Sequence, residues 1–179
     1  METPMQCAKE IADFLKEKFR EYGEKESDTG AEYNVYAGFL PREDNPKKMK
    51  TQCPAVVVRP LLIEDNTDET IAKMAIYAVT YDDDMKFGSE SLYHVLQFIR
   101  FHLLTNNPIR KRFEIKCKDS ETMETYIPDE QPYPFWQGRL DFVVYLEQPS
   151  RSPLSRPTRA RGLKSRSNKR GLPASSVAP

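Results

Sequence analysis

The segment at residues 127–146, IPDEQPYPFWQGRLDFVVYL, constrains the fold most, because a stiff stretch leads directly into a regular strand. From Leu140 to Leu146 every second residue is apolar, which is the two-residue period of a strand with one face in a core. Before it, three prolines fix φ and remove backbone donors beside a tyrosine, a phenylalanine and the chain's single tryptophan. A strand with one apolar face needs a covering layer, so the chain is expected to fold around a sheet.

Two helices are predicted from apolar residues at three- and four-residue spacing. The first is expected to begin at Pro4, with Thr3 as its cap, and to end at Gly23. The second is expected to begin with Ser89 as its cap and to stop at Asn106. Its buried stripe is predicted to be Leu92, Val95, Leu96, Ile99 and Leu103.

Five further strands are predicted, at residues 33–39, 54–63, 70–81, 113–118 and 121–127. Residues 54–63 and 70–81 are expected to form one hairpin, and residues 113–118 and 121–127 a second one, with a tight turn at Asp119-Ser120. Pro60 predicts an edge, a bulge or a bend. A helix is the alternative for residues 70–81, although their β-branched and aromatic ending favours a strand. Phe39 and Cys117 are expected on the inward faces of their strands.

Together these elements predict an α+β domain over residues 1–149, in which a single mostly antiparallel sheet carries two main helices on one face. About 149 residues bury enough surface for a stable core without metals or disulfides. Residues 41–53 are predicted to be a long polar loop, of the kind that is often functional or mobile.

The formal charge of zero hides a division of the chain into two parts. Residues 1–149 hold 19 basic and 27 acidic residues, whereas residues 150–179 hold eight basic and no acidic residues. This basic tail has no aromatic residue and few large aliphatic ones, which predicts disorder. Seven of its cations are candidates for salt-dependent contact with nucleic-acid phosphates: Arg156, Arg159, Arg161, Lys164, Arg166, Lys169 and Arg170. The alternative is a solvated extension, or one that contacts the acidic domain.

The sequence predicts no catalytic residue, no cofactor and no metal site. His94 and His102 lie eight residues apart on one predicted helix, without a carboxylate at metal-binding spacing. Residues 82–84, three aspartates, could bind a divalent cation, but a solvated loop is the favoured interpretation. The cysteines form no metal-binding pattern and are expected to be reduced, mostly buried thiols in a cytoplasmic protein: Cys7, Cys53 and Cys117. No membrane span and no secretory peptide are predicted.

Four segments in order, CPAVVVRPLLIEDNTDE, TYDDDMKFGSESLYHVLQFIRFHLLTN, FEI and YIPDEQPYPFWQGRLDFVVYL, resemble tail terminator (tail completion) proteins of long-tailed phages and prophages. The resemblance covers about residues 6–148. It rests on the occurrence of these segments together and in this order, since no single motif among them is specific. It implies a small α+β subunit that closes the head-proximal end of the tail tube as a ring, usually six-fold. Such a ring stops tube polymerisation and contacts the tube protein and the head-completion proteins, without catalysis or a cofactor. The resemblance further implies a location in the virion tail or neck, after assembly in the bacterial cytoplasm.

The contact surfaces of such a subunit are inferred from residue chemistry. The proline-rich stretch before the last strand is pre-ordered, so docking it costs little entropy, and Tyr133 and Trp136 are suitable anchors. Arg42, Lys47 and Lys48 of the long loop are further candidates. In the alternative interpretation these aromatic residues plug one end of the sheet, which is the role expected for Phe135. A second functional hypothesis is a nucleic-acid-binding adaptor that acts through the basic tail.

Overall fold

The computed structural model describes residues 2–25, 33–66, 69–117 and 122–147. The hypotheses on the cations of the basic tail, and the turn predicted at Asp119-Ser120, therefore lie outside the described residues. The described residues belong to one compact unit, Met1–Pro149.

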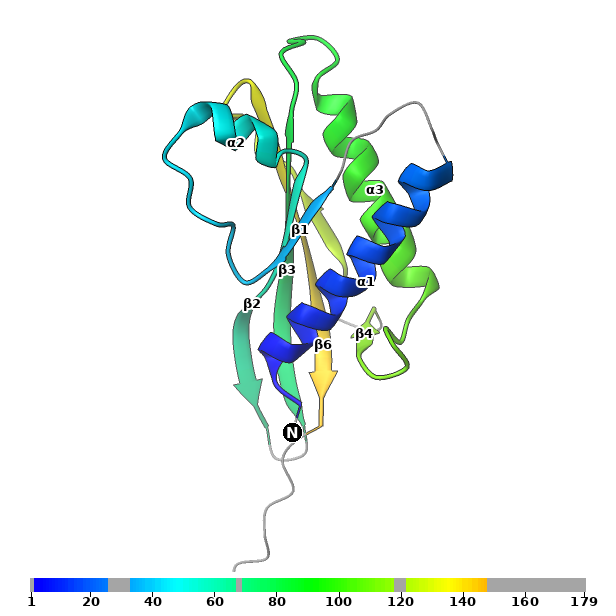
Figure 1. The fold of residues 1–179 in the computed structure, drawn as a ribbon. Coiled ribbons are helices and arrows are strands. Elements are labelled where there is room, and N and C mark those ends of the chain that lie inside the picture. The colour runs from blue at the N-terminus through cyan, green and yellow to red at the C-terminus, as the bar shows by residue number, and fades with distance from the viewer. Residues whose placement is uncertain (1, 26–32, 67–68, 118–121, 148–179) are drawn as a thin grey trace, which may run out of the picture. The chain divides into compact units, whose positions relative to one another are not determined.

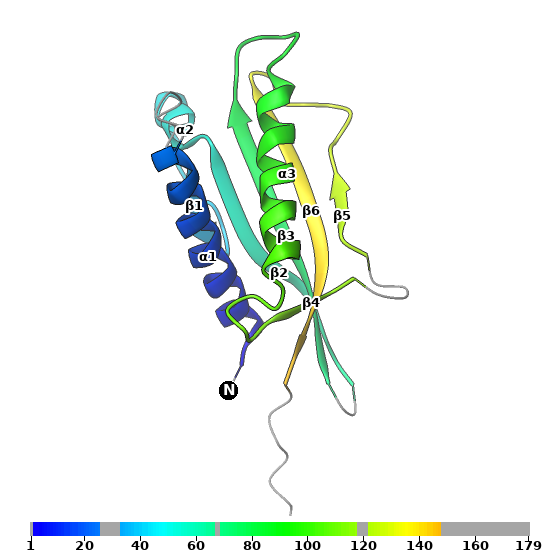
Figure 2. The ribbon, with the colours of Figure 1, turned by 90° about the vertical axis from the view of Figure 1, so that its right-hand side faces the viewer.

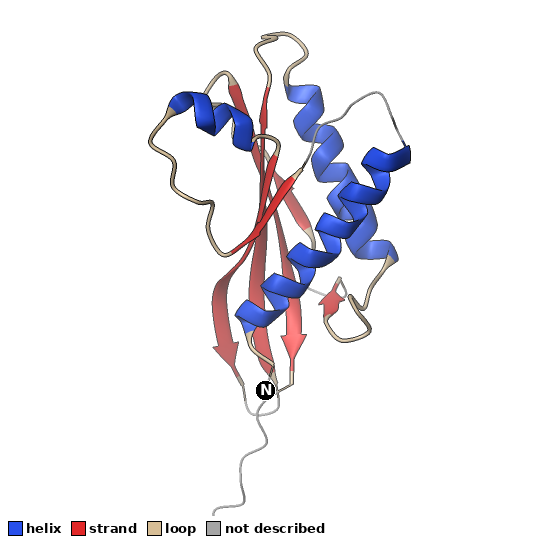
Figure 3. Ribbon diagram, viewed as in Figure 1, coloured by secondary structure: helices blue, strands red, loops and turns tan. Residues whose placement is uncertain are grey.

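The fold is a six-stranded, mostly antiparallel sheet with α1 and α3 packed on one face (Figures 1 and 3), which confirms the predicted α+β class. The strand order is β1-β2-β3-β6-β4, β5 also pairs with β6, and only the pair β1–β2 is parallel. In chain order the elements are α1 (Pro4–Lys25), β1 (Asn34–Ala37), α2 (Pro46–Gln52), β2 (Ala55–Asp65), β3 (Thr70–Tyr81), α3 (Ser89–Thr105), β4 (Glu114–Lys116), β5 (Glu124–Tyr126) and β6 (Phe135–Leu146).

The core lies between the sheet and its two helices (Figure 2), and two sequence patterns place it. Along β6, alternate residues from Leu140 to Leu146 are buried, as predicted. The buried side of α3 consists of the five residues predicted for its apolar stripe. Thr3 Oγ1 accepts the Gln6 N–H at 3.1 Å, which confirms the predicted cap of α1.

The hairpin of β2 and β3 also forms as predicted, so the helical alternative for residues 70–81 is wrong. Ala55 to Val58 are buried at consecutive positions, because this part of β2 has neighbours on both faces. The pairing register shifts between Pro60 and Leu62, which confirms the predicted irregularity at this proline.

The predicted hairpin of residues 113–118 with residues 121–127 is wrong. Both short strands pair with β6 instead, with Glu114 opposite Tyr145 and Glu124 opposite Asp141. The twelve-residue strand β6 is long enough to pair with β4 and β5 one after the other along a single edge. Cys117 follows the last residue of β4 and is exposed, not inward-facing.

Three further predictions are corrected at the ends of elements. The first helix passes Gly23 and ends at Lys25, because a glycine breaks a helix only weakly. Gly88, not Ser89, is the N-cap residue of α3, and no side chain caps this helix. Phe39 is 76% exposed, since Gly38, with φ +94°, turns the chain away from the sheet after β1.

The segment predicted as a long polar loop contains a short helix, α2. The Nζ of Lys50 in this helix lies 4.1 Å from the ring centroid of Tyr81, which belongs to the sheet face opposite α1 and α3. A cation above an aromatic ring is attracted by the ring's quadrupole. This contact and the bond from the Asn34 side-chain amide of β1 to the Gln52 carbonyl, at 3.0 Å, attach α2 to the sheet, although α2 has no apolar stripe that the sequence could have revealed.

We expect the three cysteines to react with iodoacetamide in the order Cys117, Cys53, Cys7. Burial, with help from Glu10 and Glu2, raises the pKa of the Cys7 thiol to about 12, and burial also raises the pKa of Cys53. Since the thiolate is the reactive form, a raised pKa and low access both slow alkylation. Peptide mass spectrometry after timed labelling at neutral pH measures the order, and labelling in denaturant is the control. Early labelling of Cys7 in the folded protein would contradict the expectation.

Candidate docking surface

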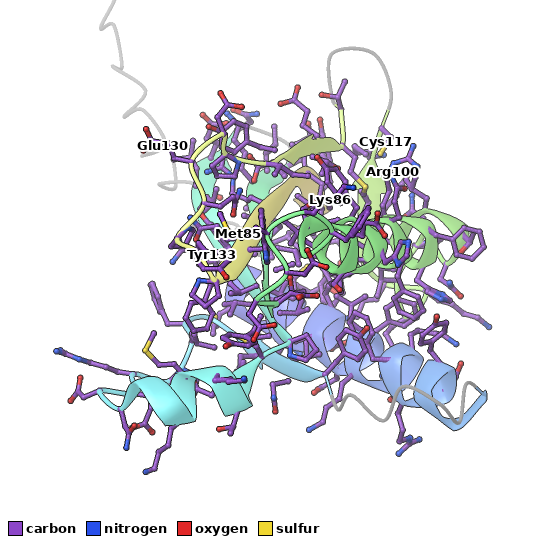
Figure 4. The ribbon with its side chains drawn as sticks, turned by 90° about the horizontal axis from the view of Figure 1, so that it is seen from above. Met85, Lys86, Arg100, Cys117, Glu130 and Tyr133 are labelled. Atoms are coloured by element: carbon purple, nitrogen blue, oxygen red, sulfur yellow. The ribbon has the colours of Figure 1, made fainter. Side chains whose placement is uncertain are left out.

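Two segments that are far apart in the sequence form one end of the sheet, and we call residues 82–88 and 128–136 together the crown. Strands β3 and β6 are antiparallel, with Tyr81 opposite Phe135. The loop that leaves β3 must therefore lie beside the stretch that enters β6, at the end of the sheet where α2 also lies (Figure 1). Figure 4 looks down on the crown, with Met85, Tyr133 and Glu130 labelled.

Hydrogen bonds join the two segments of the crown. The Tyr133 hydroxyl donates to the Asp83 carbonyl at 2.8 Å, and Trp136 Nε1 donates to the Asp82 carbonyl at 3.1 Å. The Asp82 N–H donates in turn to the Pro134 carbonyl at 3.1 Å. Three bonds across one junction fix the proline-rich stretch against the acidic loop, so the crown presents a preformed surface.

Gln131 orders the proline-rich stretch from within. Its side chain accepts the Gln137 N–H at 2.7 Å and donates to the carbonyls of Pro128 and Gln137, at 2.7 and 3.1 Å. Prolines provide no N–H for a strand ladder, so the amide of Gln131 replaces part of the missing pairing. Sequence reasoning missed this residue, because a glutamine between prolines has no pattern that indicates such a role.

The acidic loop of the crown is ordered by its own aspartates. Asp84 Oδ1 accepts the N–H groups of Lys86 and Phe87, at 2.7 and 3.1 Å, and Asp82 Oδ1 accepts the Asp84 N–H at 2.9 Å. Two of the three carboxylates are thus used as local turn acceptors. The Asp83 side chain is exposed and has no partner among the described residues.

The crown exposes large apolar side chains among charged residues that are mostly acidic, with Lys86 Nζ 5.0 Å from the Phe87 ring centroid. Met85 is 78% exposed, Phe87 52% and Tyr133 50%. The exposed acidic residues of the crown are Asp83, Asp84, Asp129 and Glu130. Apolar groups that are held in place and rimmed by charge are typical of protein–protein contact sites.

The aromatic residues predicted to contact a partner differ in exposure. Tyr133 is exposed on the crown, whereas Trp136 is partly buried against the core, as the alternative of a plug requires. Phe135 was the residue expected to plug the sheet against a helix, but it packs edge-on against Tyr81 on the face opposite α1 and α3, with 5.4 Å between ring centroids. Trp136, on the next position of the strand, packs against the core instead. Whether Trp136 also contacts a partner stays a prediction.

The basic candidates lie around α2. Arg42 is highly exposed and pairs with Asp44 at 3.2 Å, and Lys48 lies 3.8 Å from Glu43. The side chain of Lys47 is outside the described residues. Since α2 and the crown lie at the same end of the sheet (Figure 1), the basic candidates and those of the crown lie there too. No bond between the two groups is observed among the described side chains.

Neither a family model nor a curated protein matches this chain. Within residues 2–25, 33–66, 69–117 and 122–147, no three histidine, cysteine or carboxylate side chains gather as metal ligands would. The helices in these ranges are too short or too polar to cross a membrane. His94 is exposed, and the His102 ring lies 4.4 Å from the Phe98 ring, so both sit on or beside the surface of α3, as expected.

We expect Trp136→Phe to lower the free energy of unfolding by about 1 kcal/mol, because it removes the donor to the Asp82 carbonyl and keeps most of the apolar contact. Tyr133→Phe removes the equivalent bond to the Asp83 carbonyl at a more exposed position, so its expected loss is smaller, about 0.5 kcal/mol. Urea denaturation of the two variants gives the comparison. A larger loss for Tyr133→Phe would show that the crown is not held in this way.

Proposed function

We propose that this protein is an assembly subunit of a phage tail. In this proposal it forms a ring, expected to be six-fold, on the head-proximal end of the tail tube, stops tube growth there and contacts the head-completion proteins. The observation that supports the proposal is the crown. It is built from two of the segments that carry the resemblance to tail terminator proteins, and it presents preformed apolar and acidic surface at one end of the sheet.

The crown has the properties expected of a surface that binds a protein rather than a small substrate. Its aromatic and methionine side chains project outward, whereas the bonds that hold it are directed to the backbone of its own neighbour segment. Tyrosine, methionine and phenylalanine are enriched at interface cores, and fixing them in advance reduces the entropy lost on docking.

The first test is native mass spectrometry of the full chain and of a chain ending at Pro149, over a range of protein concentrations. Closed assemblies of one size in both are expected. The second test adds the protein to polymerising tail tube protein from the same phage or prophage, with tube length measured by electron microscopy. Shorter tubes with one end closed are expected, and tubes of unchanged length would contradict the proposal.

A second candidate function is nucleic-acid binding, which the division of charge favours. The eight cations of residues 150–179 would release counterions from a duplex, so affinity for DNA would fall steeply with salt. Titration of a short DNA duplex with both chains tests this. A duplex affinity that is lost when the chain ends at Pro149, together with a monomeric state of both chains, would replace the assembly proposal by this one.

A further inference from the structure

The sheet face opposite α1 and α3, which we call the open face, carries a row of alternating aromatic and arginine side chains. The order across the strands is Phe39, Arg59, Tyr77, Arg139 and Tyr126. The guanidinium carbon of Arg59 lies 5.0 Å from the Phe39 ring centroid and 4.4 Å from that of Tyr77, and the guanidinium carbon of Arg139 lies 5.7 Å from the Tyr126 ring centroid. Arg59 Nη2 donates to the Tyr77 hydroxyl at 2.9 Å, and Tyr77 lies opposite Arg139 in the pairing of β3 with β6. Aromatic residues and arginine are the side chains most enriched at binding hot spots.

The two arginines of this row differ in one respect that matters for binding. Arg139 pairs with Asp141 at 2.8 Å, so its charge is compensated within the chain. Arg59 has no carboxylate partner among the described residues. The Nε atoms of both arginines are buried without a hydrogen-bond acceptor in these residues, so the difference lies in the ion pair alone. A buried donor without a partner costs stability, so the position of Arg59 between Phe39 and Tyr77 is not explained by stability alone. The guanidinium is fixed in place and its charge is unmatched.

The open face is hollowed beside Arg59. A depression of about 500 Å³ is lined by apolar residues that include Leu61, Leu62 and Val143, together with Lys73 and the carboxylates Glu124 and Asp141. The pairing of Leu62 with Lys73 places this depression just beyond the bulge that follows Arg59 in β2. Leu61 and Leu62 are each 46% exposed, so the hollow offers apolar surface next to an unmatched positive charge.

The crown is the chemical complement of this surface. It carries the exposed, unpartnered carboxylate of Asp83 next to the exposed apolar side chains of Met85 and Phe87. Carboxylate and guanidinium form the strongest side-chain ion pairs, and apolar side chains beside them would enter the hollow. The two surfaces occur on the same chain but at different places, one on the face of the sheet and one at its end.

We propose that the crown of one copy docks on the open face of the next copy, with Asp83 of the first paired to Arg59 of the second. This inference rests on the proposed function, since it specifies the contact between subunits of the ring. A contact between two different patches is heterologous and is repeated from copy to copy, so it closes into a ring when the rotation per copy allows it. Charge complementarity selects a second copy as the occupant, because the crown of the same chain carries the exposed carboxylates that Arg59 lacks as partners.

The test uses two charge-reversal variants of the full chain, Arg59→Glu and Asp83→Lys. Each variant alone brings like charges together at every contact, so its dissociation constant for self-association is expected to rise at least about tenfold. In an equal mixture, the Arg59→Glu copy faces the Lys at position 83 of the other, and the unchanged Arg59 faces an unchanged Asp83. Native mass spectrometry of the mixture is therefore expected to show restored assemblies that contain both variants in equal numbers.

Two controls isolate the proposed contact. Lys16→Glu and Asp13→Lys make the same charge changes on exposed positions of α1, on the other side of the sheet, and are expected to assemble like the original chain. Thermal denaturation checks that each variant is folded. If a reversal variant is unfolded, Arg59→Gln and Asp83→Asn take its place, and each is expected to weaken assembly without rescue in the mixture.

The outcomes separate the two proposals. If the original chain assembles and both reversal variants assemble equally well, the contact is overturned and the assembly function stands. If folded reversal variants lose assembly but their mixture does not regain it, the pairing of Asp83 with Arg59 is overturned. If the original chain stays monomeric at every concentration and also fails to shorten tubes, both proposals are overturned.

Discussion

Gly88→Ala is expected to lower the free energy of unfolding by about 1–3 kcal/mol and to disorder the crown. A Cβ at this position would lie 2.4 Å from the Asp84 carbonyl oxygen, 2.6 Å from Trp136 Nε1 and 3.1 Å from Asp82 Cβ. The backbone at Gly88 has φ −58° and ψ −26°, which any residue can adopt, so the expected effect comes from space and not from strain. The Asp84 carbonyl is part of the backbone and also accepts the Gly88 N–H at 2.9 Å, so it cannot move without breaking the start of α3.

Gly88→Ala is also expected to disturb the contact between the two segments of the crown. Moving the indole of Trp136 breaks its bond to the Asp82 carbonyl, which is one of the three bonds between the two segments of the crown. Self-association is therefore expected to weaken together with stability. Urea denaturation and native mass spectrometry of the same sample measure both consequences.

Gly23→Ala is the matched control. Gly23 lies inside α1, and a Cβ there would meet nothing within 4 Å. Alanine restricts the unfolded chain and favours the helix, so this variant is expected to gain about 0.5–1 kcal/mol. Equal effects of the two substitutions would contradict the close packing described at Gly88.

The elements that sequence reasoning placed correctly have a periodic apolar face. The alternation from Leu140 to Leu146 and the stripe of α3 each determine which residues are buried without knowledge of any partner. The β2–β3 hairpin follows in the same way, because its strands are consecutive and each is rich in β-branched residues. These features are local, so the sequence alone contains them.

The elements that were missed depend on distant partners. Helix α2 has no apolar stripe. Its observed contacts with the sheet are made by Lys50, above the ring of Tyr81, 31 positions later in the chain, and by the Gln52 carbonyl, which accepts from the Asn34 side-chain amide at 3.0 Å. Strands β4 and β5 were predicted to pair with each other because they are close in sequence. In the structure each of them pairs with the long strand β6 instead. No local rule decides between these pairings, since both satisfy the same backbone groups.

The candidate site was predictable only in part. Tyr133 was identified from its residue type, but the bonds that fix the crown end on the backbone carbonyls of Asp82 and Asp83. Every residue has a backbone carbonyl, so the residue type does not indicate which carbonyl will accept such a bond. The sequence therefore could not show that the acidic loop and the proline-rich stretch form one surface. The row of arginine and aromatic residues on the open face was missed for a related reason. Its members come from five separate segments and are aligned only by the register of the sheet.

Asn107→Ala is expected to lower the free energy of unfolding by roughly 1–3 kcal/mol, the sum of two lost hydrogen bonds. Asn107 Nδ2 donates to the Ile115 carbonyl at 2.8 Å, and Asn107 Oδ1 accepts the Ile115 N–H at 2.9 Å. The side-chain amide thus pairs with β4 as a neighbouring strand would, on the edge that does not face β6. Ile115 is itself buried, so the change weakens the attachment of a core residue.

The neighbouring Asn106 provides the matched control, because it is the same residue type with a different role. Its side chain donates to the His102 carbonyl at 2.9 Å at the exposed end of α3, so Asn106→Ala is expected to cost less, about 0.5 kcal/mol. Amide hydrogen exchange gives the second measurement. In Asn107→Ala the Ile115 N–H loses its acceptor and is expected to exchange faster, whereas the N–H groups in the centre of β6 keep their partners in β3. Unchanged protection at Ile115, or equal losses of stability in the two variants, would mean that β4 is held by its pairing with β6 alone.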